Sequence, residues 1–135
     1  MVSNRKLGND FEKDLCKLLS EHGFWVHNFA QSRDGQPADI IAVRHGVAYL
    51  IDCKVCTNTL KGFDLSRMEE NQDLSMDLWE TCGNGKGWFA IKLHDSIYMI
   101  PHSTIRSLRA VKSHMSPSEI FMQGEAVGRW LKRYK

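Results

Sequence analysis

Three charged side chains stand where charge is costly, at the ends of two apolar segments. Asp39 closes the sequence Pro-Ala-Asp directly before Ile-Ile-Ala-Val, and thirteen residues later the apolar run from Val47 ends in Asp52-Cys-Lys54. A charge inside such a run costs several kcal/mol unless it is paired or binds a metal ion. The two acids and the lysine therefore predict a site for a divalent cation and a phosphate group.

The spacing of these residues predicts a common surface for them. In a strand over residues 47–55, Asp52 and Lys54 point to the same side because side chains alternate, and a neighbouring strand can bring Asp39 beside them. Two close carboxylates repel each other, and a divalent cation relieves the repulsion. Oxygen ligands suit Mg²⁺, with Mn²⁺ as a substitute, better than they suit zinc.

These residue types match the tasks of phosphodiester hydrolysis. A divalent cation polarises a phosphoryl oxygen and lowers the pKa of a bound water. A lysine beside it stabilises the extra negative charge of the transition state or positions the water. The sequence thus favours a metal-dependent hydrolytic site at Asp39, Asp52 and Lys54.

Cys53 and Cys56 offer an alternative metal site of the zinc type. Their spacing matches one half of such a site, but the remaining cysteines, Cys16 and Cys82, do not form a second pair. A structural zinc site usually needs four ligands. An offset of three along a strand also tends to point the two sulfurs to opposite faces. We expect reduced, mostly buried cysteines instead.

Two polar side chains accompany the predicted helices. Glu12 lies beside the apolar stripe of a helix over residues 4–22, where it can face either the sheet or the solvent. Gln72 lies within the apolar stripe of a helix that runs to about Thr81. A buried amide needs hydrogen-bond partners, so Gln72 is either a site residue or a core amide with local partners.

The periodicity of apolar residues predicts an α/β protein with a central mixed sheet flanked by helices. The expected order is helix, three strands, helix, two strands and C-terminal helices (αβββαββ plus helices). Turns at residues 45–46 and 94–95 join adjacent strands, and Ser66 with Glu69 forms a possible capping box for the second helix. The tryptophans are expected to pack rather than to stack on bases: Trp25, Trp79, Trp88 and, in the last helix, Trp130.

The composition of the chain fits one globular domain over residues 1–135. The chain is 42% hydrophobic and 25% charged, and no apolar run approaches the roughly 20 residues needed to cross a bilayer. The N-terminus has no apolar signal segment. We expect a cytoplasmic protein without membrane contact, in a bacterial, archaeal or phage-infected cell.

The net charge of +2 is unevenly distributed. Seven Lys or Arg stand between His102 and Lys135 against two acids, whereas six acids and one Arg stand between Phe63 and Cys82. A basic C-terminal segment suits a phosphate backbone. A solvated helix face is the alternative.

The two motifs resemble those of the PD-(D/E)xK nuclease superfamily. Pro37-Ala-Asp39 corresponds to its first element and Asp52-Cys-Lys54 to its second, where the family often has the longer Glu in place of Asp52. The resemblance implies a restriction-endonuclease-like core that hydrolyses DNA. It also implies metal ligation by Asp39, Asp52 and an acid of the first helix, here Glu12. Gln72 matches a glutamine that several subfamilies place in the helix after the second motif.

Within the superfamily, the chain is most similar to Holliday junction resolvases of the RecU and archaeal type. The similarity lies in Gly8-Asn-Asp-Phe-Glu12, in the polar loop before Pro37 and in Gln72. It implies a homodimer that nicks two strands symmetrically across branched DNA. The long insertion that separates the junction arms in some resolvases is not evident, since Thr57 to Gly62 is short. A restriction-type or replication-associated nuclease and a DNA-binding module without turnover are the alternatives.

Candidate DNA contacts lie outside the catalytic set. Ser32 and Arg33 precede the first motif in a polar loop that can meet a phosphate or simply turn the chain. Lys61 and Lys86 are candidate backbone contacts, with plain solvation as the alternative reading.

Overall fold

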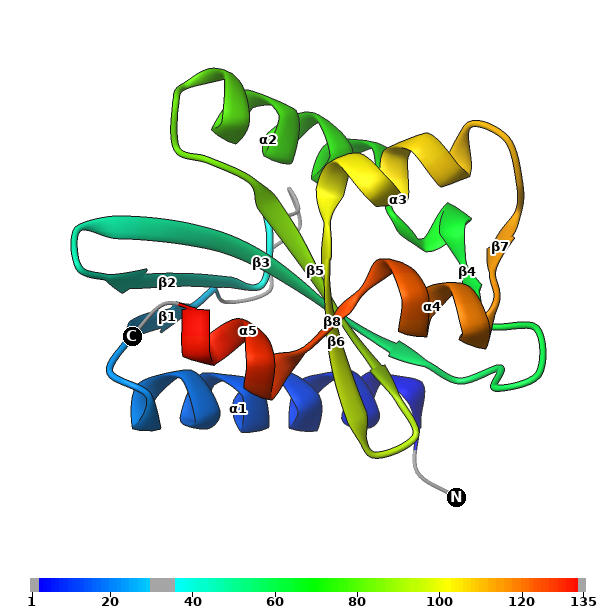
Figure 1. Ribbon diagram of the computed structural model, residues 1–135, viewed down its shortest axis with the longest axis horizontal. Coiled ribbons are helices and arrows are strands. Elements are labelled where there is room, and N and C mark those ends of the chain that lie inside the picture. Colours follow the sequence, from blue (N-terminus) through cyan, green and yellow to red (C-terminus); the bar gives the residue numbers. More distant parts are fainter. Residues whose placement is uncertain (1–2, 30–35, 134–135) are drawn as a thin grey trace.

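A six-stranded sheet forms the centre of the protein (Figure 1). The computed structural model describes residues 3–29 and 36–133. In chain order the elements are α1 (Asn4–Glu21), β1 (Trp25–Asn28), β2 (Ile40–Arg44), β3 (Val47–Cys56), β4 (Phe63–Asp64), the 3-10 helix η1 (Leu65–Arg67), α2 (Glu70–Thr81), β5 (Gly87–Leu93), β6 (Ser96–Pro101), α3 (His102–Arg109), β7 (His114–Met115), α4 (Pro117–Gln123), β8 (Glu125–Ala126) and α5 (Val127–Arg133).

The sheet is mixed, as the sequence predicts. Its strand order is β1-β2-β3-β5-β6-β8, with β3 and β5 parallel and the other neighbours antiparallel. Parallel neighbours need a long crossover, and here it contains β4, η1 and α2. The predicted αβββαββ order and the fold class are confirmed.

Helices cover both faces of the sheet. α1 and α5 lie on one face, whereas α2, α3 and α4 lie on the other (Figure 1). Each face has its own apolar core. The first core contains Phe11 and Leu15 of α1 and Trp130 of α5, and the second contains Met76 of α2 and Ile105 of α3.

The central strand β3 contributes to both cores because its side chains alternate. Tyr49, Ile51 and Cys53 belong to the core under α1, whereas Leu50 and Cys56 belong to the core under α2. The two cysteines therefore lie on opposite sides of the sheet, which confirms the prediction that excluded a shared zinc site for them.

The predicted turns have the backbone that tight hairpins require. His45 and Gly46 join β2 to β3 with φ angles of 52° and 76°, the left-handed values of a type I′ turn. His94 has a φ of 54° in the turn between β5 and β6. Both hairpins are confirmed.

The start of α2 differs from the prediction. Ser66 lies in η1, where its backbone N–H and its hydroxyl donate to Asp64 Oδ1, so it does not cap α2. Glu69 is the N-cap of α2, and its backbone N–H donates to Gln72 Oε1 at 3.1 Å. The capping box is therefore formed by Glu69 and Gln72.

Short elements complete the molecule and were absent from the prediction. β4 and β7 form a separate two-stranded sheet, and β8 adds the outermost strand next to β6. Each has two residues, so its sequence carries no alternation that could predict a strand.

The tryptophans are divided between core and surface. Trp130 is fully buried and lies 6.0 Å from Phe24 and 5.7 Å from Trp88, measured between ring centroids. Trp88 is buried and Trp79 is half-buried, but Trp25 is 64% exposed. The prediction of a core position is wrong for Trp25, because β1 is an edge strand of the sheet.

Much of the C-terminal basic charge is paired within the chain. Arg106 lies 2.8 Å from Asp77 and Arg109 lies 2.8 Å from Asp73, so basic residues of α3 meet acidic residues of α2. Lys112 likewise pairs with Glu119. The two charged segments of the sequence thus neutralise each other across the α2–α3 contact.

The helices also bear on the predicted lack of membrane contact. Among the described residues, no helix combines the length and the apolar character needed to cross a membrane.

Candidate active site

Asp39 is fixed just before β2 by its backbone and its side chain. Its backbone N–H donates to Ile51 O at 3.2 Å, and its carbonyl accepts from Phe29 N at 2.8 Å. Its carboxylate accepts from Cys53 N at 2.7 Å and from Gln36 Nε2 at 2.9 Å. The carboxylate of Asp39 therefore lies against β3, as the sequence predicts.

Asp52 and Lys54 point to the same side of β3. Lys54 Nζ lies 3.2 Å from Asp52 Oδ2, and Gln72 Nε2 donates to Asp52 Oδ1 at 3.3 Å. Asp52 is completely buried, and its Oδ2 has the lysine within ion-pair distance but no hydrogen bond of proper geometry. A buried carboxylate oxygen in this state is ready to accept a further ligand.

Glu12 brings a third carboxylate to the same place from α1. It is 9% exposed. Burial, and then the negative charge of Asp39, raise the pKa of Glu12 to about 7. Burial also raises the pKa of Asp52 well above its usual value, and Asp39 adds to this while Lys54 opposes it. Without a cation, the pocket therefore holds more negative charge than it can stabilise.

These side chains share one polar pocket of about 250 Å³. The residues that line it come from α1, from the segment before β2, from β3 and from the start of α2: Glu12, Gln36, Asp39, Cys53, Lys54, Arg67, Glu69, Asn71 and Gln72. The structure thus brings Glu12, Asp39, Lys54 and Gln72 together, and Asp52 lies directly behind them.

The donor set fits a hard divalent cation. Within residues 3–29 and 36–133, no group of three or more His, Cys, Asp or Glu side chains is arranged to hold a metal ion. Asp52 Oδ2 nevertheless needs a partner, and Asp39 and Glu12 supply oxygens beside it. Mg²⁺ is commonly bound by one or two carboxylates together with water, so a preformed three-carboxylate cage is not required.

The candidate DNA contacts do not line this pocket. Ser32 and Arg33 fall outside the described residues. Lys61 is exposed in the turn before β4. Lys86 is also exposed, and its Nζ lies 5.9 Å from the centroid of the Trp88 ring.

Arg67 and Gln36 are pocket residues that sequence reasoning missed. Arg67 lies over the Phe63 ring at 5.4 Å, and its Nη1 donates to Val55 O at 2.5 Å. The available signal was its isolation, because Arg67 is the one basic residue in an otherwise acidic segment. Gln36 offered a weaker signal as the polar residue directly before Pro37.

Comparisons with known proteins agree with this geometry. The family model described as archaeal Holliday junction resolvase (Hjc) matches residues 3–120. Among solved structures, the Hjc resolvase of Archaeoglobus fulgidus, an archaeal hyperthermophile, is similar with a TM-score of 0.68 and 18% identity. The match covers 92% of this chain and 99% of that one. No curated protein matches.

The mixed sheet and its pocket of carboxylates and lysine define the class of protein, a resolvase-like nuclease. The chain belongs to the archaeal Holliday junction resolvase family, whose members are structure-specific nucleases of DNA recombination.

Proposed function

We propose that the protein is a Mg²⁺-dependent endonuclease that cleaves four-way DNA junctions. The observation that carries this proposal is the convergence of Asp39, Asp52 and Lys54 in one polar pocket. The family supports branched DNA as the substrate. Mn²⁺ is expected to substitute for Mg²⁺, since both prefer oxygen ligands.

The carboxylates would hold the cation. Asp39 and Asp52 would ligate it directly, and Glu12 would ligate it directly or through water. When bound, the ion polarises a phosphoryl oxygen and lowers the pKa of a bound water. Asp39 is suited to this role because the N–H of Cys53 and the amide of Gln36 fix its orientation.

Lys54 and Gln72 act from the two sides of Asp52. The Lys54 side chain is 12% exposed and lies 3.2 Å from Asp52, which holds the ammonium group at the pocket. There it stabilises the extra negative charge that a phosphate acquires in the transition state. The Gln72 amide donates to the other oxygen of Asp52 and so fixes the rotation of that carboxylate.

Contacts to the DNA backbone would surround the pocket. Ser32, Arg33, Lys61 and Lys86 stay predictions for this role. Arg67 joins them as a cation that lines the pocket itself.

A homodimer would give two such pockets, one for each strand cut across a junction. The candidate surface is an apolar groove of about 290 Å³ lined by Pro37, Ile41, Leu50, Leu78 and Trp79, among others. Leu74 and Leu78 of α2 are 56% and 64% exposed beside it. A second copy is the occupant that suits it, because α2 also carries Gln72 and a contact there would fix the relation between two active sites.

A cytoplasmic location is part of the same proposal and rests on the DNA substrate of the family.

Cleavage of a panel of labelled DNA substrates tests the function. The panel contains a four-way junction, a flap, a nicked duplex and a plain duplex, each with and without Mg²⁺. We expect cutting of the junction in Mg²⁺, loss of cutting in Asp39→Asn and Lys54→Ala, and retained binding of the junction by both. Asp95→Asn and Lys17→Ala change the same residue types at exposed positions and serve as controls that cut normally.

Three results would contradict the proposal. Normal cleavage by Asp39→Asn or Lys54→Ala would remove the assigned site. Equal cutting of linear duplex would indicate a restriction-type nuclease. Salt-sensitive binding with no product from any substrate would indicate a DNA-binding module without turnover.

A further inference from the structure

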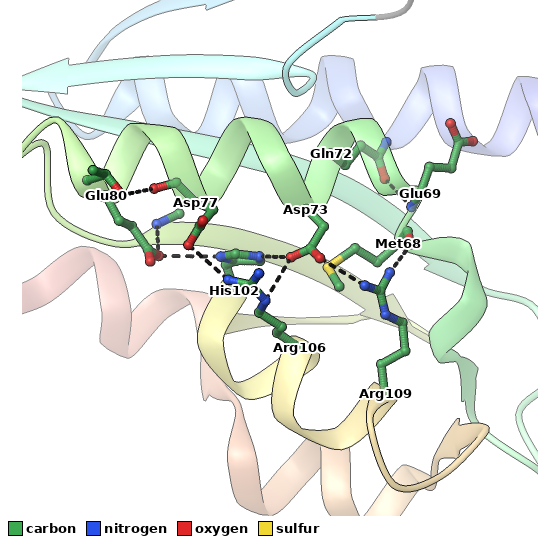
Figure 2. Close-up of polar contacts among 11 residues, drawn as sticks. Met68, Glu69, Gln72, Asp73, Asp77, Glu80, His102, Arg106 and Arg109 are labelled. Carbon is green, nitrogen blue, oxygen red and sulfur yellow. Dashed lines mark hydrogen bonds and ion pairs between the residues drawn. The ribbon is translucent and has the colours of Figure 1, made fainter.

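A polar network lies buried between α2 and α3, behind the active site (Figure 2). His102 Nε2 lies 2.6 Å from Asp73 Oδ1, and Arg109 Nη2 donates to Asp73 Oδ2 at 2.8 Å. His102 is 1% exposed and Asp73 is 7% exposed. Both oxygens of a buried carboxylate are therefore held by side chains of α3.

Arg109 makes a second contact that explains why this network concerns the active site. Its Nη1 donates to Met68 O at 2.7 Å. Met68 directly precedes the N-cap Glu69, and Asp73 lies at the end of the first turn of α2. One guanidinium group thus ties together the two ends of the segment 68–73.

Gln72 lies within that segment and points to the other side of the helix. Its Oε1 accepts from the backbone N–H of Glu69 at 3.1 Å, and its Nε2 donates to Asp52 at 3.3 Å. An N–H donor and a carboxylate acceptor require the amide in this orientation. The position of the amide therefore depends on where the backbone of Glu69 lies, and Arg109 fixes the backbone next to it.

We propose that Arg109 and Asp73, supported by His102, are positioning residues for the active site. They hold the first turn of α2 so that Gln72 meets Asp52. This inference rests on the proposed nuclease function for its meaning, and its geometry is testable without DNA or metal.

Arg106 provides the contrast within the same network. It lies 3.5 Å from Asp73 and 2.8 Å from Asp77, but its printed contacts do not include Met68 or Glu69. Arg106 belongs to the same helix and bears the same charge, so Arg106→Lys is the matched control for Arg109→Lys. A lysine keeps the charge but cannot bridge two acceptors as the planar guanidinium does.

The first test reads the Gln72 amide directly by NMR in the protein without DNA or metal. The side-chain NH₂ signals of Gln72 are identified by their loss in Gln72→Ala. We expect Arg109→Lys and Asp73→Asn to move them to the position of solvent-exposed glutamines and Arg106→Lys to leave them in place. Unchanged signals in both Arg109→Lys and Asp73→Asn would overturn the proposal.

The second test is a double-mutant cycle on Mg²⁺ binding, measured by the metal-induced rise in Tm without DNA. Loss of a partner that orients a metal ligand commonly costs about 10–100-fold in metal affinity. We expect Gln72→Ala and Arg109→Lys each to raise the half-saturating Mg²⁺ concentration about tenfold, and the double variant to raise it no further. Additive effects would mean that Arg109 does not act through Gln72.

The two proposals fail in different ways. A wild-type protein that cuts no DNA in the substrate panel sinks the nuclease function and leaves the NMR test intact. If Arg109→Lys does not fold, Asp73→Asn carries both tests, because it removes the charged acceptor while preserving the shape of the side chain.

Discussion

The carboxylates of the pocket are held where their charge is expensive, and the electrostatic cost falls most clearly on Glu12. Its pKa is raised to about 7 from an ordinary value of 4.5, first by burial and then by Asp39. The folded protein therefore keeps the Glu12 proton over a range of pH in which the unfolded chain has lost it. Folding stability from this group is full below pH 4.5 and declines as the pH rises through about 7.

Glu12→Gln should change the pH dependence of stability in the metal-free protein. Between pH 5 and pH 8 we expect the wild type to lose up to about 3 kcal/mol of its free energy of unfolding through Glu12. The variant should escape that loss and be the more stable of the two at pH 8. Urea denaturation at several pH values measures it. Asp52 shifts in the same direction and leaves a residual decline in both proteins.

Metal ion and a matched variant complete this experiment. Mg²⁺ binds the ionised carboxylates, so it should restore stability at pH 8 in the wild type and much less in Glu12→Gln. Glu21→Gln changes an exposed residue of the same helix and should behave as the wild type does. Equal pH profiles for Glu12→Gln and the wild type would contradict the assigned environment of Glu12.

Arg67 is the residue at the pocket with a free path to a phosphate. Its guanidinium is exposed, is steadied by Phe63 and uses one N–H on Val55 O, which leaves other donors for a ligand. Arginine matches phosphate geometry with its planar set of donors. The acids around the pocket would be screened by the cation in the working enzyme.

Arg67→Ala should weaken junction binding evenly across sequences. Loss of one phosphate contact reduces the slope of log affinity against log salt by about one. Fluorescence anisotropy at several salt concentrations, with Ca²⁺ in place of Mg²⁺ to prevent cutting, measures the slope. Arg129→Ala removes an exposed arginine from α5 and should leave the slope unchanged. A normal slope in Arg67→Ala would exclude the contact.

At this scale the sequence predicted the residues whose placement is local. Asp52 and Lys54 share a face because strands alternate, and Glu12 follows from helical periodicity. Arg67 and Gln36 were missed, because their positions depend on a 3-10 turn and on a loop whose paths no periodicity describes.

At the scale of elements, long periodic segments were predictable and short ones were not. α1 and the two hairpins follow from apolar spacing and turn residues. The beginning of α2 was assigned to Ser66, whose hydroxyl instead bonds to Asp64 in η1. Two equally good capping sequences overlap there, and tertiary contacts of Gln72 with β3 decide between them.

Gly62 is the position where the small sheet of β4 and β7 admits no side chain. Its φ is 97°, and a Cβ there would lie 1.9 Å from Met115 O. Gly62→Ala combines a strained backbone with this clash, and we expect it to lower the free energy of unfolding by about 3 kcal/mol or more. Thermal and urea unfolding measure the loss.

Gly46 separates the two causes. It has a φ of 76° and nothing within 4 Å of a Cβ, so Gly46→Ala bears the backbone cost alone, about 1 kcal/mol. An equal loss in both variants would show that the clash at Met115 is relieved by movement of β7.

At the scale of the whole molecule, the opposite charges of α2 and α3 are used to join two helices. Arg106 and Arg109 meet Asp77 and Asp73, so these arginines are not available to DNA as they stand. The sequence shows a basic segment and an acidic one, but only the tertiary structure reveals that they face each other.

The apolar groove beside α2 predicts the assembly. Leu78→Asp places a charge in that groove, and we expect a dimer to become a monomer, measured by sedimentation in reducing buffer since Cys82 is exposed. On a plasmid with an extruded cruciform, the monomer should give single nicks in place of paired cuts. Leu60→Asp, at a residue that is 91% exposed, is the control. An unchanged mass would place the dimer contact elsewhere.

The last helix, α5, marks a difference between the part of the chain that is recognised and the part that must be present to fold. The family match ends at residue 120, yet Trp130 and Leu131 of α5 fill the core opposite α1. A chain shortened after residue 120 would uncover Phe24, Tyr49 and Trp88 at once. Truncation of one buried tryptophan alone costs about 3–5 kcal/mol, a large share of the stability of an ordinary domain. The smallest folding unit therefore extends to the end of α5, and the fluorescence of Trp130 would report its loss.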